Sequence, residues 1–259
     1  MMNSTKSSPH NENYATELHW SFWLGVTFFV LVIVAIFSLS WFVNKRLSSD
    51  ESALVTSVVI SGEMPYSNKH DIEQAIDAVN LGNFFKLDVN EIQQKVVSLP
   101  WVYSVSVRKK WPNELKIYVV DQHPIAIWNG NFFINNSGQA FQAMMSRVAH
   151  HLPSFYGPEG TEKIALKNYR DLNRLLQFNQ LAIDELLLSE RFSWQLTLND
   201  GVTLNLGREN RVERIQRFMH IYSDIKHNSK GGHQVGYVDL RYDTGVAVGW
   251  KPSTIKKRA

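Results

Sequence analysis

The sequence predicts an α+β protein with a single N-terminal transmembrane helix, a small module ordered strand, helix, helix, strand, strand, and a larger, mainly antiparallel β domain. The first observation behind this prediction is a run of 24 residues without a charge, at 20–43. The second is a pair of short amphipathic helical patterns flanked by strand patterns, and the third is a series of alternating apolar runs joined by Gly-containing turns. A length of 259 residues allows one large domain or two small ones.

The apolar run at 20–43 is long enough to cross a membrane, because about 20 helical residues span a bilayer core. Trp23 and Trp41 lie near its ends, where indole rings favour the membrane interface. A cleaved signal peptide is the alternative, but its apolar part is usually about 7–15 residues long, and no small-x-small cleavage motif follows the run. Lys45 and Arg46 favour a cytoplasmic C-terminal part, a preference that a long following domain weakens. The residues alone leave the orientation open.

The segments beside these elements are short and polar. Residues 1–19 are rich in Ser and Asn and are predicted to form a tail, 44–51 a linker, and 251–259 a basic tail. The net charge of +3 is too small to indicate nucleic-acid binding. The absence of cysteine excludes disulfides, thiolate metal sites and a cysteine nucleophile.

The module at 52–122 begins with a strand at 52–63 and continues with two helices. Apolar residues at 72, 75, 76 and 79 have helical spacing. Asp88 is predicted to cap the second helix, with Glu91 three residues further on. Two strands follow around a Pro-Asn turn, with Tyr103 and Val107 expected on the inward face of the first. The predicted core of the module is Ile72, Ile76, Ile92, Val105 and Ile117.

The remainder of the chain, 123–250, is predicted to form the β domain. Asn129-Gly130 and Asp200-Gly201, each between apolar runs, predict two hairpins. Helices are expected at 162–178 and at about 209–225, the second with residues 212, 215, 219 and 222 toward the core. The chain then enters one last strand-like run, YVDLRYDTGVAVGW (237–250), with no later segment predicted to cover it.

No pattern in the sequence indicates an active site or a cofactor site. His150 and His151 are neighbours, which point to opposite faces of an extended chain and so rarely bind one metal together. Asp239, Arg241 and Asp243 indicate a solvated ion cluster rather than acid–base catalysis. The basic stretch RKKWP (108–112) indicates a solvated strand end rather than a nucleic-acid site. There is no G-x-S-x-G elbow and no phosphate-binding loop, Gly231-Gly232 being a plain loop, so a protein-binding role is favoured over an enzyme.

Three stretches resemble a known family. LPWVYSVSVRKKWPNELKIYVVDQHPIAIWN (99–129) resembles the end of the POTRA domain of the FtsQ/DivIB family of bacterial cell division proteins, and SWQLTLNDGVTLNLGR and YVDLRYDTGVAVGWKP resemble its β domain. The likeness covers nearly all of the chain after the apolar run, although 142–190 is looser. It implies a POTRA domain at 52–122, a β domain at 123–250, and a bitopic inner-membrane protein with both domains in the periplasm, against the local charges.

The resemblance also implies a division-site scaffold without catalytic activity or cofactor. Such proteins recruit the FtsB–FtsL pair and link early cytoplasmic assembly to septal wall synthesis, and their POTRA domain is tied to upstream components such as FtsK. The last strand of the β domain is implied to be the docking edge for a strand of FtsB, and an open edge makes sense where a partner strand completes the sheet. The residues that match docking positions are Arg191, Arg241, Tyr242, Asp243, Thr244, Gly245, Val246 and Trp250.

Within this set, Tyr242 and Trp250 are expected to be aromatic anchors, and 243–245 to let a second backbone approach closely. Phe192 departs from the family pattern, because a second basic residue is expected there. The alternatives are a terminal strand that the domain itself covers, a membrane-anchored POTRA-type chaperone or translocation factor, and a membrane-tethered wall hydrolase. The translocation type continues into a long barrel, whereas this chain stops at Ala259; a hydrolase needs a nucleophile or metal set that the sequence does not show.

Overall fold

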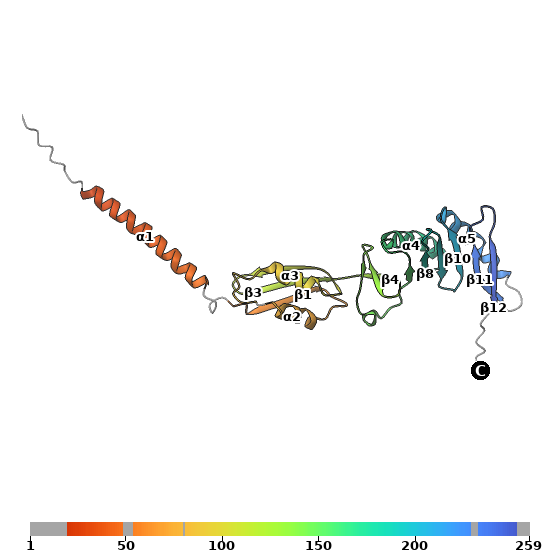
Figure 1. Ribbon diagram of the computed structural model, residues 1–259, viewed down its shortest axis with the longest axis horizontal. Helices are drawn as coiled ribbons and strands as arrows, with labels where there is room; N and C mark the ends of the chain where they lie inside the picture. Colours follow the sequence, from red (N-terminus) through yellow and green to blue (C-terminus); the bar gives the residue numbers. More distant parts are fainter. Residues whose placement is uncertain (1–19, 49–53, 80, 229–232, 253–259) are drawn as a thin grey trace, which may run out of the picture. The chain divides into compact units, whose positions relative to one another are not determined.

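The computed structural model describes residues 20–48, 54–79, 81–228 and 233–252 (Figure 1). The predicted tail at 1–19, the end of the predicted linker at 49–51, the Gly231-Gly232 loop and most of the basic tail, 253–259, lie outside the described residues. The described residues fall into two compact units, and each is taken by itself below. One holds the residues up to Thr56 together with Leu81–Leu87, and the other holds the rest.

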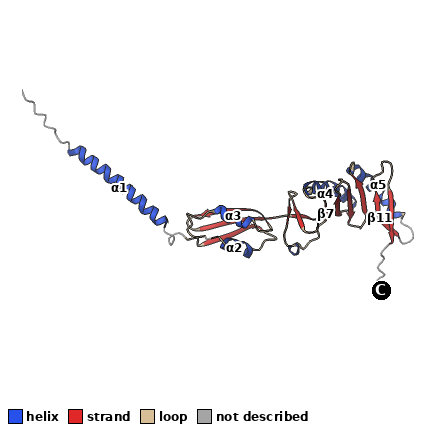
Figure 2. Ribbon diagram, in the orientation of Figure 1, coloured by secondary structure: helices blue, strands red, loops and turns tan. Residues whose placement is uncertain are grey.

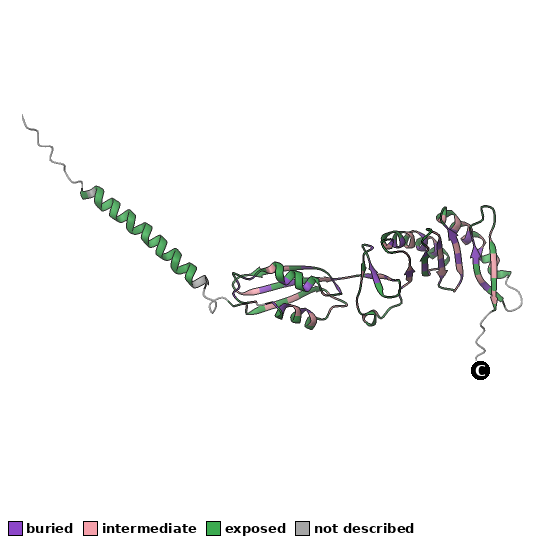
Figure 3. Cartoon of the chain, in the orientation of Figure 1, coloured by how far each residue is buried: buried purple, intermediate pink, exposed green. Residues whose placement is uncertain are grey.

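The first unit is dominated by helix α1, Trp20–Ser48. Its segment Phe22–Lys45 is long and apolar enough to span a membrane, with a mean hydropathy of 2.6, and its described side chains are exposed (Figure 3). The hydroxyls of Thr27 and Ser38 donate to the carbonyls of Trp23 (2.7 Å) and Ala35 (3.0 Å), so these two polar groups are satisfied inside the helix, as a bilayer requires. The helix continues through residues 44–48, which the sequence analysis assigned to a linker.

The second unit begins with an N-terminal module of three strands and two helices (Figure 2). Its elements are β1 (Ser57–Glu63), α2 (Lys69–Asp77), α3 (Val89–Val97), β2 (Val102–Lys110) and β3 (Glu114–Asp121). β3 lies in the centre of the sheet, parallel to β1 and antiparallel to β2. Side-chain caps begin both helices: Asn68 accepts from the amide of His70, and Asp88 from that of Asn90. The predicted cap at Asp88 is confirmed.

The core of this module contains all five of the predicted residues, because Ile72, Ile76, Ile92, Val105 and Ile117 are buried. The strand predicted at 52–63 begins only at Ser57. Tyr103 is wrongly predicted to face inward: it is 47% exposed. A register shift between Val102 and Ser104 explains the error, since it places Val102 rather than Tyr103 inside and breaks the alternation on which the prediction rested.

The β domain is built on a nine-stranded sheet in the order β12-β11-β10-β9-β8-β7-β4-β5-β6. Five neighbouring pairs are antiparallel, and the three pairs β4/β7, β7/β8 and β10/β11 are parallel. The strands are β4 (Pro124–Trp128), β5 (Phe132–Asn135), β6 (Ala140–Phe141), β7 (Ser154–Tyr156), β8 (Ile183–Leu188), β9 (Trp194–Leu198), β10 (Thr203–Gly207), β11 (His233–Asp239) and β12 (Ala247–Pro252). The predicted α+β class with a mainly antiparallel β domain is confirmed.

Both predicted hairpins form. Asn129 and Gly130 turn β4 into β5 with positive φ angles of 49° and 81°, a conformation that Asn and Gly adopt at little cost. Asp200 and Gly201 turn β9 into β10, and Gly201 has a φ of 78°. The inward residues 194, 196 and 198 of the first strand and 202, 204 and 206 of the second are all buried, as their alternation predicts.

Two helices pack against each other and against the sheet of this domain: α4 (Glu162–Leu176) and α5 (Arg211–His227). Short 3-10 turns lie at Met145–Arg147 and Gln177–Asn179. In α5, Ile215 and Tyr222 are buried as predicted, whereas Val212 is exposed and Phe218 occupies the core instead. The Tyr222 hydroxyl donates to the Asp200 carboxylate, which ties α5 to the β9–β10 turn. Burial and this hydrogen bond raise the pKa of Tyr222.

The C-terminal run is the largest difference from the sequence prediction. One strand was expected over 237–250, but the chain forms a hairpin in which β11 ends at Asp239 and β12 begins at Ala247. Residues 240–246, called the 240–246 loop below, join the two strands. The backbone turns here because Leu240 is fully buried and its N–H donates to the carbonyl of Asn205 on β10 (3.0 Å), which fixes the exit from β11.

Candidate partner-binding edge

β12 is the last strand of the nine-stranded sheet and pairs with β11 on one side. No strand among the described residues pairs with its other side, which therefore forms an edge of the sheet over six residues. Val246, Val248 and Trp250 alternate along this end of the chain; the first two are half-buried against the domain core, and Trp250 is 43% exposed. The edge therefore has an apolar face that ends in an open indole ring.

The 240–246 loop presents most of the residues that the family resemblance selected. Arg241, Tyr242, Asp243, Thr244 and Gly245 are exposed residues, and Tyr242 is 57% exposed. Val246 is half-buried, so less of it is available to a partner. The sequence predicted that residues 241–246 belong to the terminal strand. This prediction is wrong, because that strand starts only at Ala247. The candidate site is thus a loop followed by a strand.

Asp239 and Arg241 form an ion pair at the base of this loop. The Arg241 Nη2 lies 2.6 Å from Asp239 Oδ2, its Nε lies 2.9 Å from Oδ1, and its backbone N–H donates to the same carboxylate at 3.1 Å. The Asp239 side chain is buried, whereas that of Arg241 is 60% exposed. The hydrogen bond from the Arg241 guanidinium, against the opposing effect of burial, holds the pKa of Asp239 below its usual value. Asp239 and Asp243 do not share one strand face, because Asp243 lies in the loop.

Arg191 lies at the same end of the sheet as Arg241, although fifty residues separate them in the sequence. Arg191 is in the turn between β8 and β9, three residues before Trp194. Trp194 pairs with Gly207 of β10, and Asn205 of β10 pairs with Asp239 at the end of β11. The strand register therefore brings the Arg191 turn and the 240–246 loop to one end of the sheet, with β10 between them. Phe192 is exposed beside Arg191, with a φ of 58°.

Sequence reasoning missed a glycine and an aromatic ring on the hairpin that ends in β12. A Cβ atom at Gly249 would lie 2.0 Å from Cε1 of Tyr237, its partner on β11, so the tyrosine ring lies directly over the glycine. Any larger residue at 249 would displace this ring. Alternation places Tyr237 and Gly249 on the face opposite Val238 and Val248, which is the signal that could have revealed their contact. That signal is usable only when the hairpin between the two strands is known.

It also missed two arginines of α5 that bind the loop. Arg217 donates to the carbonyls of Leu240, Tyr242 and Asp243 at 2.7–2.8 Å. Arg214 donates to the carbonyl of Leu206 and, at 3.4 Å, to that of Arg241. In the sequence, an arginine next to the buried positions of a helix cannot be told from one that is solvated. No signal therefore identified these contacts.

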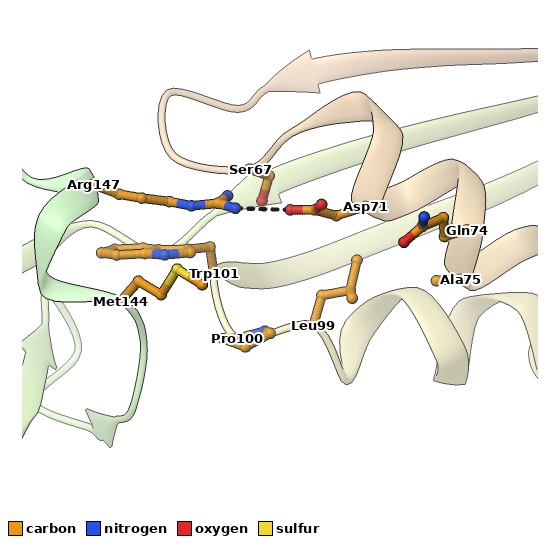
Figure 4. A pocket seen from close by; sticks show the side chains of 9 residues that line it. All are labelled: Ser67, Asp71, Gln74, Ala75, Leu99, Pro100, Trp101, Met144 and Arg147. Carbon is orange, nitrogen blue, oxygen red and sulfur yellow. Dashed lines mark hydrogen bonds and ion pairs between the residues drawn. The ribbon is translucent and has the colours of Figure 1, made fainter.

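A second candidate site is a cavity of about 460 Å³ between the N-terminal module and the start of the β domain. Figure 4 shows Arg147 pointing toward Asp71 across this cavity, with Nη2 and Oδ2 2.9 Å apart. Arg147 also donates to the carbonyl of Tyr66 at 2.6 Å, and the Tyr66 ring stacks on Trp101 with centroids 4.7 Å apart. The ring of Phe133 also packs against Trp101, with centroids 5.3 Å apart. These contacts connect the N-terminal module with the start of the β domain and form a structural junction between them.

The junction is reinforced by a buried carboxylate. Asp121 accepts hydrogen bonds from the backbone N–H groups of Tyr66 (2.8 Å) and Ser67 (2.7 Å) and from the Ser67 hydroxyl. Arg147 pairs with Asp71, and Asp121 accepts from three donors, so these charged groups are engaged in contacts that hold the junction together.

The other candidates from the sequence have structural explanations. His151 Nε2 lies 3.6 Å from Asp184 at the surface, and no group of three or more His, Asp or Glu side chains able to hold a metal occurs in the part of the chain that the structure describes. Lys110, in the basic stretch at 108–112, pairs with Glu114 across the β2–β3 turn at 3.1 Å.

Comparison with known families agrees with this architecture. The model of the POTRA domain, FtsQ-type, matches residues 54–122, and that of the cell division protein FtsQ/DivIB C-terminal region matches residues 126–241. An apolar N-terminal helix followed by these two domains defines a class of bacterial division proteins. The chain belongs to the FtsQ/DivIB family.

Relatives named cell division protein FtsQ are similar over most of their length. The protein of Shewanella oneidensis is 37% identical over 91% of this chain and 88% of its own. That of Escherichia coli K12 is 36% identical over 96% of this chain and 90% of its own, and that of Vibrio cholerae is 34% identical over 88% and 87%. The similarity thus extends across both domains, and a role in cell division follows from it.

Proposed function

We propose that this chain is a non-enzymatic scaffold of the division machinery, which recruits FtsB, and FtsL with it, through the β12 edge and the 240–246 loop. In this role it links early cytoplasmic division assembly to septal wall synthesis in the periplasm. The proposed domains are POTRA at 52–122 and the β domain at 123–250. Recruitment by FtsK is assigned to the POTRA domain and membrane segment, and its test is the septal localisation of the chain in cells depleted of FtsK.

The open β12 edge is the observation that carries this proposal. A strand of six residues at the end of a nine-stranded sheet can add one more strand through backbone hydrogen bonds. Soluble domains usually shorten, charge or cover such edges. Here the strand itself carries the exposed ring of Trp250, and the exposed ring of Tyr242 lies in the loop before it; such rings are frequent anchors of protein interfaces.

The chemistry of the site favours an extended partner with apolar and acidic side chains. The edge supplies backbone donors and acceptors, and the two aromatic rings supply apolar contact area. Arg191 and Arg241 supply positive charge at the end where the loop begins. Because Arg241 is already paired with Asp239, an acidic partner group would share or take over this cation rather than find it free.

The proposed topology places 1–19 in the cytoplasm and the residues after the helix in the periplasm. Family membership and α1 support it, against the local charges of Lys45 and Arg46. Alkaline phosphatase fused after Ala259 should therefore be active. An inactive phosphatase together with an active cytoplasmic reporter at the same position would overturn this orientation.

Hydrogen exchange tests the docking mode directly. The full chain in detergent is exchanged alone and with the periplasmic segment of FtsB from the same organism. Edge-strand addition predicts slower exchange at β12 amides when the segment is added, since outward amides gain a backbone acceptor. β6, the opposite edge of the same sheet, is the internal control and should not change. Saturating segment without added protection in β12 would rule out this docking mode.

A further inference from the structure

We infer that Arg217 of α5 is a positioning residue for partner binding, which holds the 240–246 loop in its binding conformation through three backbone carbonyls. This inference rests on the function proposed above. Arg217 need not contact the partner itself, because it acts through the 240–246 loop, which is proposed to contact the partner.

One guanidinium makes all of the contacts between Arg217 and the loop. Nη2 of Arg217 donates to the carbonyls of Leu240 (2.8 Å) and Tyr242 (2.7 Å), and Nη1 donates to that of Asp243 (2.7 Å). Three carbonyls within a stretch of four residues are thus bound by one guanidinium. Hydrogen bonds from a charged donor are shorter and stronger than neutral ones, and the planar fork of arginine sets their directions.

The helix that carries Arg217 is itself firmly placed. Ile215 and Phe218 on either side of it are fully buried, and Tyr222 one turn on is bonded to Asp200. Nε of Arg217 is buried without a hydrogen-bond partner among the described residues, so the side chain lies below the surface up to its head group. A group on a packed helix orients a loop more accurately than a group on another loop.

Arg214, one turn earlier, closes the base of the same loop. Its guanidinium reaches the carbonyls of Leu206 and Arg241, and a Cβ at Gly207 would lie 2.9 Å from Arg214 Nη1 and 3.2 Å from Arg241 Cγ. Gly207 also has a φ of 71°, so a larger residue would be strained as well as crowded. The missing side chain at Gly207 therefore leaves space for Arg214 of α5 to lie beside Arg241 of the loop.

The side chains on the clamped stretch are the exposed ones. Arg241, Tyr242 and Asp243 have their backbone carbonyls bound by arginines of α5, and their side chains are open to solvent. A loop that is free to sample other conformations would bind in proportion to the fraction of time spent in the competent one. Binding then depends on Arg217 even if no atom of it reaches the partner.

The test is Arg217→Lys in the full chain in detergent, with the affinity for the periplasmic FtsB segment measured by calorimetry. One ammonium cannot bridge three carbonyls in fixed directions, so the affinity should fall about tenfold, as for a loop that is competent one-tenth of the time. Exchange of the amides of 240–246 in the free chain should become faster. The unfolding midpoint should fall by no more than about 4 °C, since the change affects one loop of the domain.

Arg211→Lys is the matched control, because Arg211 is on the same helix and binds Asn168 and the carbonyl of Arg208 instead of the loop. It should keep wild-type affinity. Arg217→Gln, which keeps a donor at its end, replaces Arg217→Lys should that variant not fold. Wild-type affinity for the Arg217 variant, while Tyr242→Ala binds weakly, would overturn the positioning role alone. Wild-type affinity for Tyr242→Ala and Trp250→Ala as well would remove the proposed docking site, and the positioning role with it.

Discussion

The two edges of the nine-stranded sheet are built in opposite ways. β6 has two residues, and its Phe141 packs with Phe133 of β5 and with Trp101 of the N-terminal module. β12 has six residues; Trp250 within it and Tyr242 in the loop before it are exposed. One edge is short and has its aromatic ring packed inside the protein, and the other is long and has exposed rings. The open edge is therefore a local feature of β12 rather than a consequence of the architecture.

The same contrast applies to aromatic side chains. At the β6 end, rings fill a small core, and their removal should act on stability. At the β12 end, rings lie on the surface, and their removal should act on binding. Substitutions at the two ends should therefore separate loss of stability from loss of binding.

The largest expected effect is on stability at the β6 end. Phe133 is 1% exposed and packs on Trp101 and Phe141, so Phe133→Ala should lower the free energy of unfolding by about 3–5 kcal/mol. Chemical denaturation of the full chain in detergent measures it. At a temperature where the variant is folded, its affinity for the FtsB segment should equal that of the wild type. A stability unchanged within 1 kcal/mol would mean that this end is not a packed core.

The second effect is on binding at the open end. Tyr242→Ala and Trp250→Ala should each weaken binding of the FtsB segment by about 2 kcal/mol or more, roughly thirtyfold in Kd. Their unfolding midpoints should stay close to that of the wild type, because both rings are exposed. Thr244→Ala is the matched control in the same loop, and it should bind normally since its backbone is unchanged. A large loss of stability with unchanged affinity would reverse the contrast between the two ends.

The smallest expected effect is on the pH dependence of stability at the Asp239–Arg241 ion pair. Arg241 lowers the pKa of Asp239 in the folded chain, so the ion pair adds stability above the unfolded value of about 3.9 and loses it as the pH falls through the lower folded value. Asp239→Asn should therefore unfold at a lower temperature than the wild type at pH 7, and this difference should shrink below about pH 4. The effect is small because solvent screens the exposed Arg241. An equal difference at pH 3 and pH 7 would show that the pair contributes nothing.

Local signals in the sequence predicted most elements of the fold. Asp88 caps α3, Asn129-Gly130 turns a hairpin, and the alternation from Trp194 to Leu206 gives two strands with one buried face. Each depends on neighbours in the chain, so each is visible in a single sequence. Tyr103 was placed wrongly because a register shift depends on the partner strand β3, which alternation within β2 cannot show.

The candidate site was predictable in composition but not in shape. The resemblance selected Tyr242 and Trp250, and both are exposed near the edge. The break between β11 and β12 was missed, because it depends on the bond between Leu240 and Asn205 and on Arg217 of α5, all distant in sequence. Arg191 joins the same end of the sheet through the register of β9, β10 and β11, which is again a property of the folded sheet.

The order of the strands along the chain determines when the open edge can come into existence. β12 pairs with β11, and β11 joins the sheet in parallel with β10, after the whole of α5. During synthesis, residues 233–252 leave the ribosome after every other described strand, and domains generally fold in the direction of synthesis. Before that moment the terminal strand of the sheet is β10, whose Leu204 and Leu206 are fully buried in the finished domain. The open edge consequently exists only after β11 and β12 have been made and paired, because β12 joins the sheet through β11 alone among the described strands.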